Sequence, residues 1–120
     1  MRYYDTLATL QRDGFEIIVD KTWEDLNPRD QFDESCCDIE EIIRDIDCGH
    51  LDWFMLRVRV LLDGHELGST YLGGMLYEDP SECLTDGSAE DMIHEAIEEA
   101  KREARRLVGS LSKVVDTLPV

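Results

Sequence analysis

Alternating apolar and polar side chains predict two β-strands in this chain. Successive side chains of a strand point to opposite faces of the sheet, so a buried face shows as an apolar residue at every second position. Residues 15–21 have this period, with Phe15, Ile17 and Val19 on one side. Residues 52–62 have it over a longer run, and a strand is expected in each stretch. The apolar side of the longer one carries Phe54, Leu56, Val58, Val60 and Leu62, and its other side carries Trp53, Met55, Arg57, Arg59 and Leu61.

A tight hairpin is predicted at Asp63-Gly64, directly after the longer strand. The two central residues of a type I′ turn need positive φ, which favours Asp-Gly. Residues 65–77 are therefore expected to return antiparallel. The expected register pairs Leu62 with His65, Val60 with Leu67, Val58 with Ser69, and Leu56 with Tyr71. Within the returning strand, Gly73-Gly74 indicates a bulge or close packing by an aromatic side chain.

Helical periodicity marks three further segments. Residues 38–47 place Ile39, Ile42, Ile43 and Ile46 on one face, the spacing of an amphipathic helix. From Ser88 a longer apolar stripe predicts a helix of more than twenty residues, which Ser88 and Asp91 are expected to cap. Its stripe consists of Ile93, Ala96, Ile97, Ala100, Ala104, Leu107, Val108 and Leu111. Residues 3–12 suggest a short first helix that ends at Gly14.

These elements predict a single α+β domain spanning residues 1–120. The expected order is α-β-α-β-β-α, a three-stranded antiparallel sheet with two or three helices on one face. The polar segment from Trp23 to Cys37 is predicted to be an acidic loop.

The net charge limits the kinds of partner that the protein is expected to bind. The chain has 28 acidic and 12 basic residues, a formal charge of −16, whereas roughly 2–8 charges suit a small domain. Like charge opposes direct binding of nucleic acid and of an anionic membrane surface. No leader or membrane span is expected from the sequence, and four cysteines suggest free thiols in a reducing cytoplasm.

Catalytic and metal-binding patterns are weak. No histidine lies in a nucleophile motif. Neither DQFDES at residues 30–35 nor EDPSE at residues 78–82 has the order of a calcium-binding loop. Cys36, Cys37, Cys48 and His50 are close in sequence but lack the paired spacing of a structural zinc site. We therefore expect no enzymatic activity and no cofactor, and a metal-binding or redox protein is the least favoured reading.

The remaining signal is the distribution of acidic residues. Residues 20–52 hold 12 acidic and 3 basic residues. Asp38, Glu41 and Asp45 would share one helical face, at a spacing similar to that of successive phosphates along a nucleic-acid strand. A solvated face is the alternative. The sequence favours a surface that binds a basic partner, because folding does not require such repulsion.

A second contact surface is suggested by the sheet side that carries Trp53, Arg57 and Arg59, since Trp and Arg are enriched at interfaces. Alternatively, another layer or a second copy in a homodimer covers this side. The residues expected to contact a partner are Asp30, Asp33, Glu34, Asp38, Glu41, Asp45, Trp53, Arg57 and Arg59.

In size and character the chain resembles the acidic phage-encoded anti-CRISPR and anti-restriction proteins that mimic DNA. FMLRVRV and DGHELGSTYLGG, within residues 54–74, also resemble small phage proteins. The resemblance implies a non-enzymatic inhibitor in the host cytoplasm whose partner is a CRISPR effector or another defence nuclease. The other reading is an immunity or antitoxin protein that neutralises a basic toxin.

Overall fold

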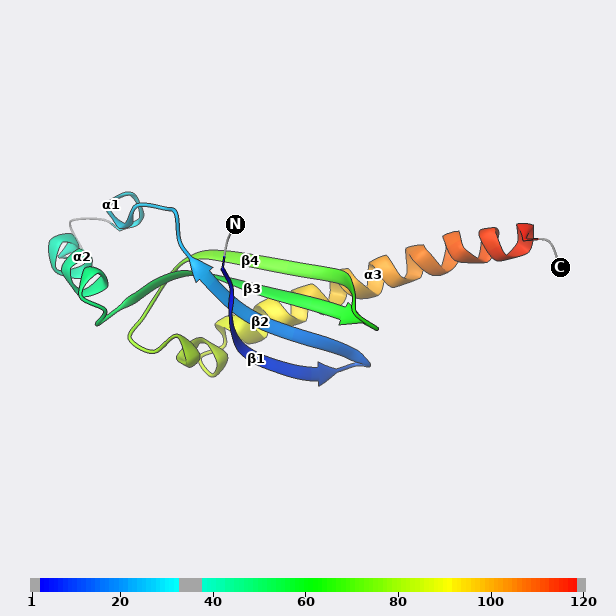
Figure 1. Ribbon diagram of the computed structural model, residues 1–120, viewed down its shortest axis with the longest axis horizontal. Coiled ribbons are helices and arrows are strands. Elements are labelled where there is room, and N and C mark those ends of the chain that lie inside the picture. The colour runs from blue at the N-terminus through cyan, green and yellow to red at the C-terminus, as the bar shows by residue number, and fades with distance from the viewer. Residues whose placement is uncertain (1–2, 33–37, 119–120) are drawn as a thin grey trace.

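The computed structural model describes residues 3–32 and 38–118 as a four-stranded antiparallel sheet with a long helix against one face (Figure 1). The strands are β1 (Asp5–Arg12), β2 (Phe15–Trp23), β3 (Asp52–Leu62) and β4 (His65–Tyr77), and they lie side by side in chain order. The helices are α1 (Pro28–Gln31), α2 (Ile39–Asp47) and α3 (Ser88–Thr117), with a 3₁₀ turn η1 (Pro80–Leu84) before α3. The α+β class is confirmed, with four strands instead of three.

The first element is a strand, so the predicted helix over residues 3–12 is wrong. Asp13 and Gly14 have φ of 55° and 84°, and Asp63 and Gly64 have φ of 50° and 82°. Both Asp-Gly pairs are thus two-residue hairpin turns with positive φ at both positions. The residue that looked like a helix stop, Gly14, reverses the chain and pairs β1 with β2.

The core lies between the sheet and the first half of α3. β2 and β3 contribute alternate side chains, and Ile17, Leu56 and Val58 are fully buried. The prediction is wrong only at Leu62, the last residue of β3, which is 43% exposed beside the hairpin turn. Against them α3 places small and branched side chains. The buried residues of α3 are Ala89, Met92, Ile93, Ala96, Ile97 and Ala100.

The β3–β4 hairpin forms as predicted, but with a shifted register. Leu62 lies opposite His65, whereas Val60 lies opposite Gly68 instead of Leu67, because a bulge separates Val60 from Leu61 in the ladder. A shift of one residue exchanges the two faces of a strand. Gly68 therefore faces α3, where a Cβ atom would lie 2.9 Å from the backbone nitrogen of Ala100.

The glycine pair in β4 has both features that the sequence indicated. A second register shift falls between Phe54 and Leu56, opposite Gly73-Gly74. Gly74 has φ of 69°, and a Cβ atom there would lie 3.5 Å from the Trp53 ring.

Two short helices lie at one end of the sheet, and the far end of α3 lies at the other (Figure 1). Residues 28–31 form α1 within the segment predicted as a loop, and α1 packs beside α2. At the start of α3 the N-cap is Gly87, without a side-chain capping bond, so the predicted cap by Ser88 is wrong. The molecule measures 68 Å along its long axis because α3 continues beyond the sheet.

Candidate acidic binding surface

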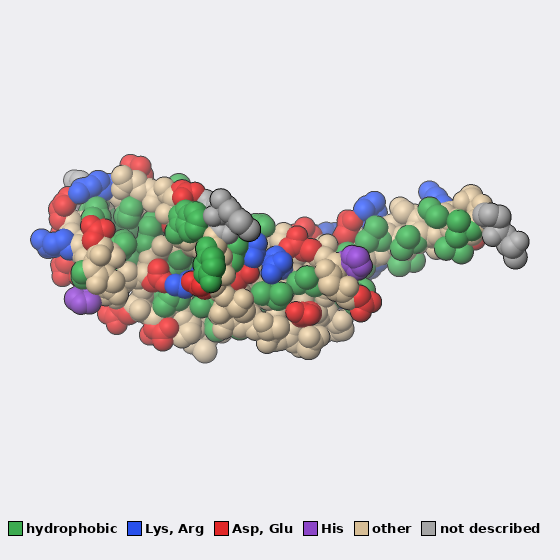
Figure 2. Space-filling model, in the orientation of Figure 1, with side chains coloured by type: hydrophobic (Ala, Val, Ile, Leu, Met, Phe, Trp, Pro, Cys, Tyr) green, Lys and Arg blue, Asp and Glu red, His purple; other side chains and the backbone are tan. Residues whose placement is uncertain are grey.

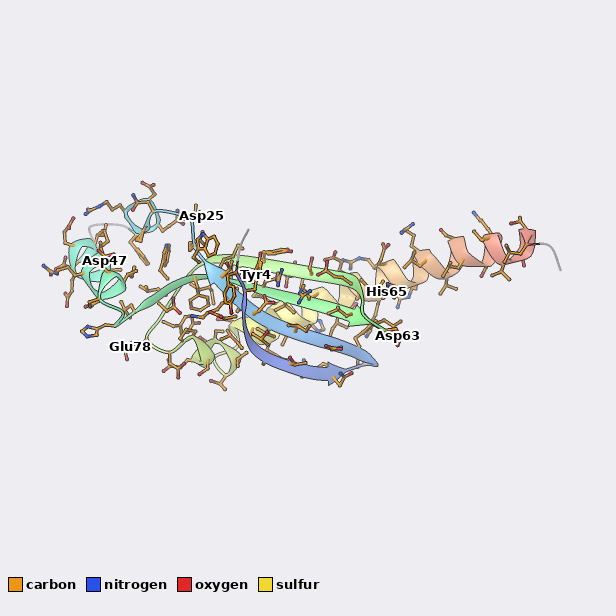
Figure 3. The ribbon with its side chains drawn as sticks, viewed as in Figure 1. Tyr4, Asp25, Asp47, Asp63, His65 and Glu78 are labelled. Carbon is orange, nitrogen blue, oxygen red and sulfur yellow. The ribbon has the colours of Figure 1, made fainter. Side chains whose placement is uncertain are left out.

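Acidic residues gather at the end of the molecule that carries α1, α2 and η1. We define the acidic end as residues 24–32, 38–51 and 78–86, which together hold twelve acidic residues and two arginines. Asp25, Asp47 and Glu78, one from each segment, all lie in this region (Figure 3). Figure 2 shows acidic side chains around this end, with a few basic side chains among them, and further basic side chains on the projecting part of α3. Acidic residues are therefore denser at this end than in the rest of the described chain.

Helix α2 carries the carboxylates that the sequence singled out. Asp38 is its N-cap and accepts a hydrogen bond from the Glu41 backbone nitrogen at 3.2 Å. Ile39 is buried, which turns Glu41 outward, and Asp45 follows one turn later, half-buried. Among the described residues, no lysine or arginine lies within ion-pair distance of Asp38 or Glu41. These two charges face solvent.

One acidic residue of α2 is instead neutralised within the acidic end. Glu40 accepts a charge-assisted hydrogen bond from Arg29, and this bond lowers the pKa of the Glu40 carboxyl. The pair links α2 to α1. Asp30, on the same short helix, is exposed.

A shallow cavity extends this surface from α2 to the segment that follows β4. It has a volume of about 360 Å³ and is lined by Asp45, His50, Leu51 and Glu78. The His50 Nδ1 atom lies 3.7 Å from an Asp45 carboxylate oxygen. Glu78 was not among the predicted contact residues, because its EDPSE segment (residues 78–82) suggested at most a calcium-binding loop. Its acidic run was the signal that could have found it.

Three potential metal ligands also meet at the C-terminal end of α2. The ligand atoms of Asp45, Cys48 and His50 all lie within 4.8 Å of one another. An oxygen, a sulfur and a nitrogen are a donor set that Zn²⁺ accepts, with a fourth position left open. Cys48 and His50 are exposed. Of the cluster considered from the sequence, Cys36 and Cys37 lie outside the described residues, as do the predicted contact residues Asp33 and Glu34.

Trp53 does not form an open contact surface, because another layer covers it. Its side chain is 8% exposed, and its indole nitrogen donates a hydrogen bond to the Leu26 carbonyl at 2.9 Å. The Phe32 ring packs on it with centroids 5.7 Å apart. The cover is thus the segment from Leu26 to Phe32, which includes α1. The sequence left open the alternative that another layer covers this side of the sheet.

Arg57 and Arg59 are engaged within the sheet. Arg57 makes two hydrogen bonds to the Asp20 carboxylate, at 2.6 and 2.8 Å, and this pairing raises the pKa of Arg57. The Tyr4 ring covers the guanidinium at 3.4 Å, and Arg59 lies 3.8 Å from the same carboxylate. Asp20 is only 2% exposed. The two arginines therefore balance a buried charge, which leaves them poorly placed to meet a partner.

No described helix is both long enough and apolar enough to cross a membrane. No protein-family model matches the sequence, and no curated protein and no solved structure matches it either. The assignment of the surface therefore depends on its charge and geometry.

Proposed function

We propose that the acidic end binds a basic, nucleic-acid-handling partner protein and inhibits it by occupying the groove that receives nucleic acid. The observation that carries the proposal is the concentration of unneutralised carboxylates on α2, next to Glu78. If these residues formed only a solvated surface, the acidic residues would not need to gather at one end of the molecule.

The physical basis is electrostatic complementarity. A concentrated negative surface accelerates association with a positive groove, and the effect decreases as salt screens the charges. Asp38, Glu41 and Asp45 occur at helical intervals of three and four residues, which places neighbouring Cβ atoms roughly 5–6 Å apart. A groove that binds successive phosphates can accept such a row. The anti-CRISPR and anti-restriction DNA mimics are the class of inhibitor that this geometry fits.

The contact residues proposed are those of the acidic end: Asp30, Asp38, Glu41, Asp45 and Glu78. Trp53, Arg57 and Arg59 are not retained as contact residues. Their side chains support the fold instead.

A competition assay with matched variants tests the proposal. A labelled DNA duplex is bound to a purified defence nuclease, and its fluorescence anisotropy is followed as this protein is added. We expect the wild-type protein to displace the duplex. The variant D38N/E41Q/D45N should compete at least tenfold less well, because three charges leave the surface while Asn at position 38 still caps α2.

The matched control is D91N/E95Q/E99Q, which removes the same charge from exposed positions of α3. It should compete like the wild type. Equal weakening by both variants would mean that total charge, and not the acidic end, determines competition. That result would contradict the proposal.

A further inference from the structure

The last third of α3 is not covered by any of the residues that the structure describes. Every described residue from Val108 to Leu118 is exposed, and the helix projects away from the sheet (Figure 1). Several of these residues are large and apolar. Val108 is 64% exposed, Leu111 58%, Val114 53%, Val115 63% and Leu118 56%. Isolated helices of this length are marginal in water, so the projecting segment lacks the packing that would stabilise it.

The exposed apolar residues follow a heptad repeat. With positions lettered a to g and Ile97 at a, every a and d position from Ile93 onward is apolar. These residues are Ile93, Ile97, Ala100, Ala104, Leu107, Leu111, Val114 and Leu118. Val108 and Val115 occupy successive e positions and widen the stripe. A sustained repeat of this kind is the pattern of helices that pack against other helices.

The two halves of this seam have different surroundings. Ile93, Ile97 and Ala100 are buried against the sheet of their own chain. Ala104 and Leu107 are half-buried, and beyond Leu107 the same seam is exposed. Figure 2 shows the resulting hydrophobic side chains along the projecting end.

We propose that the projecting segment of α3, residues 104–118, packs antiparallel against the same segment of a second copy of this chain. Charged side chains do not obstruct this contact. Arg105, Arg106, Lys113 and Asp116 occupy b, c and f positions, which lie away from the seam, and the g positions beside it are Ser110 and Thr117. The segment is therefore complementary to itself.

Net charge selects the antiparallel orientation. Residues 1–100 contain 26 acidic and 7 basic residues, a net charge of −19, whereas residues 101–120 carry +3. A parallel pair would bring two strongly acidic bodies together. An antiparallel pair separates them and places each basic helix end near the acidic body of the other copy. The dimer interface is distinct from the acidic end and does not depend on the proposed function.

Light scattering after size-exclusion chromatography tests the proposal. We expect the wild-type chain to have twice its monomer mass of 13.8 kDa and to dissociate on dilution. The variant L111D/V114D places charge at an a and a d position and should remain at 13.8 kDa at all concentrations. The control G109D/S112D adds the same charge at f and b positions of the same turns and should dimerise. Fluorescence of the buried Trp53 reports whether the body of each variant remains folded.

X-ray scattering of the wild-type dimer tests the orientation. An antiparallel pair should have a maximum dimension of about 110 Å, because two chains of 68 Å overlap over about 15 residues at ~1.5 Å each. A dimension close to that of one chain would overturn the antiparallel arrangement. A monomeric wild type, or a dimer that L111D/V114D leaves intact, would overturn the interface itself.

Discussion

At the scale of single residues, the buried carboxylate of Asp20 is the feature that sequence reasoning missed. Asp20 lies opposite Arg57 in the β2–β3 ladder, and both Arg57 and Arg59 balance its charge. A cross-strand pair of this kind requires the strand register, which the sequence alone did not provide for β2. Because the register of β2 was not known from the sequence, Arg57 and Arg59 were predicted to contact a partner.

Removing the charge of Asp20 should destabilise the fold. In D20N, two arginines in a half-buried position lose their counter-charge, and we expect a loss of about 3 kcal/mol in the free energy of unfolding, measured in urea. The exposed pair of Arg12 with Glu90 is the comparison. R12Q should leave the urea midpoint nearly unchanged, since solvent screens such pairs. Equal effects of D20N and R12Q would contradict the role given to Asp20.

The two described cysteines should differ in reactivity. Burial raises the pKa of the Cys83 thiol to about 11, whereas Cys48 is exposed. Because the thiolate is the reactive form, iodoacetamide at neutral pH should label Cys48 in the folded protein and Cys83 only after denaturation. Mass spectrometry of the labelled peptides measures both.

The raised pKa of Cys83 also sets a pH dependence. The folded state holds the thiol neutral above the pH at which the unfolded chain ionises, so stability should decrease as pH rises above about 9. C83A should flatten that decrease. Rapid labelling of Cys83 in the native protein would show that the thiol is not buried as described.

At the scale of elements, most of the fold was predictable because strand and helix periods were clear. β2, β3, β4, α2 and α3 all lie where the pattern placed them. β1 was missed because Tyr3, Leu7 and Leu10 also fit a helical spacing. The Asp13-Gly14 pair, identical in sequence to the hairpin turn at Asp63-Gly64, was the signal that favoured a strand over a helix before it.

The β4 register was not predictable, because a bulge changes the pairing without changing the alternation of residues. Its consequence is that Gly68 lies against α3. G68A should lower the free energy of unfolding by about 1–3 kcal/mol, since a Cβ atom would overlap the backbone of Ala96 and Ala100.

The matched comparison is G109A, at a helical glycine with open space around it. G109A should stabilise α3 by about 1 kcal/mol, because alanine has a higher helix propensity than glycine. Far-UV circular dichroism during urea unfolding measures both variants. A G68A variant at least as stable as the wild type would show that α3 does not approach β4 as closely at Gly68 as the structure places it.

At the scale of the whole molecule, charge and hydrophobicity are arranged along one axis. The acidic end carries α1 and α2, the sheet and the first half of α3 form the core, and the projecting helix is basic and apolar (Figure 2). The excess of acidic residues was evident from composition. The higher density of acidic residues at one end was not evident from composition. Residues 78–86 lie near α2 only because β4 carries the chain back to that end. An antiparallel dimer would present two acidic ends, one at each extremity.

If the acidic end occupies a nucleic-acid-binding groove, DNA should compete with it for the partner, and elution by DNA measures this competition. The protein is immobilised, a lysate of its natural host is passed over it at low salt, and bound proteins are eluted with a short DNA duplex. We predict that the duplex releases a nucleic-acid-handling protein, and that D38N/E41Q/D45N retains none while D91N/E95Q/E99Q retains it. The acidic end would not be the binding surface if the retained protein bound the first variant as well as it binds the wild type. A retained protein that resisted the duplex, as a basic toxin would, would show that no nucleic-acid groove is occupied.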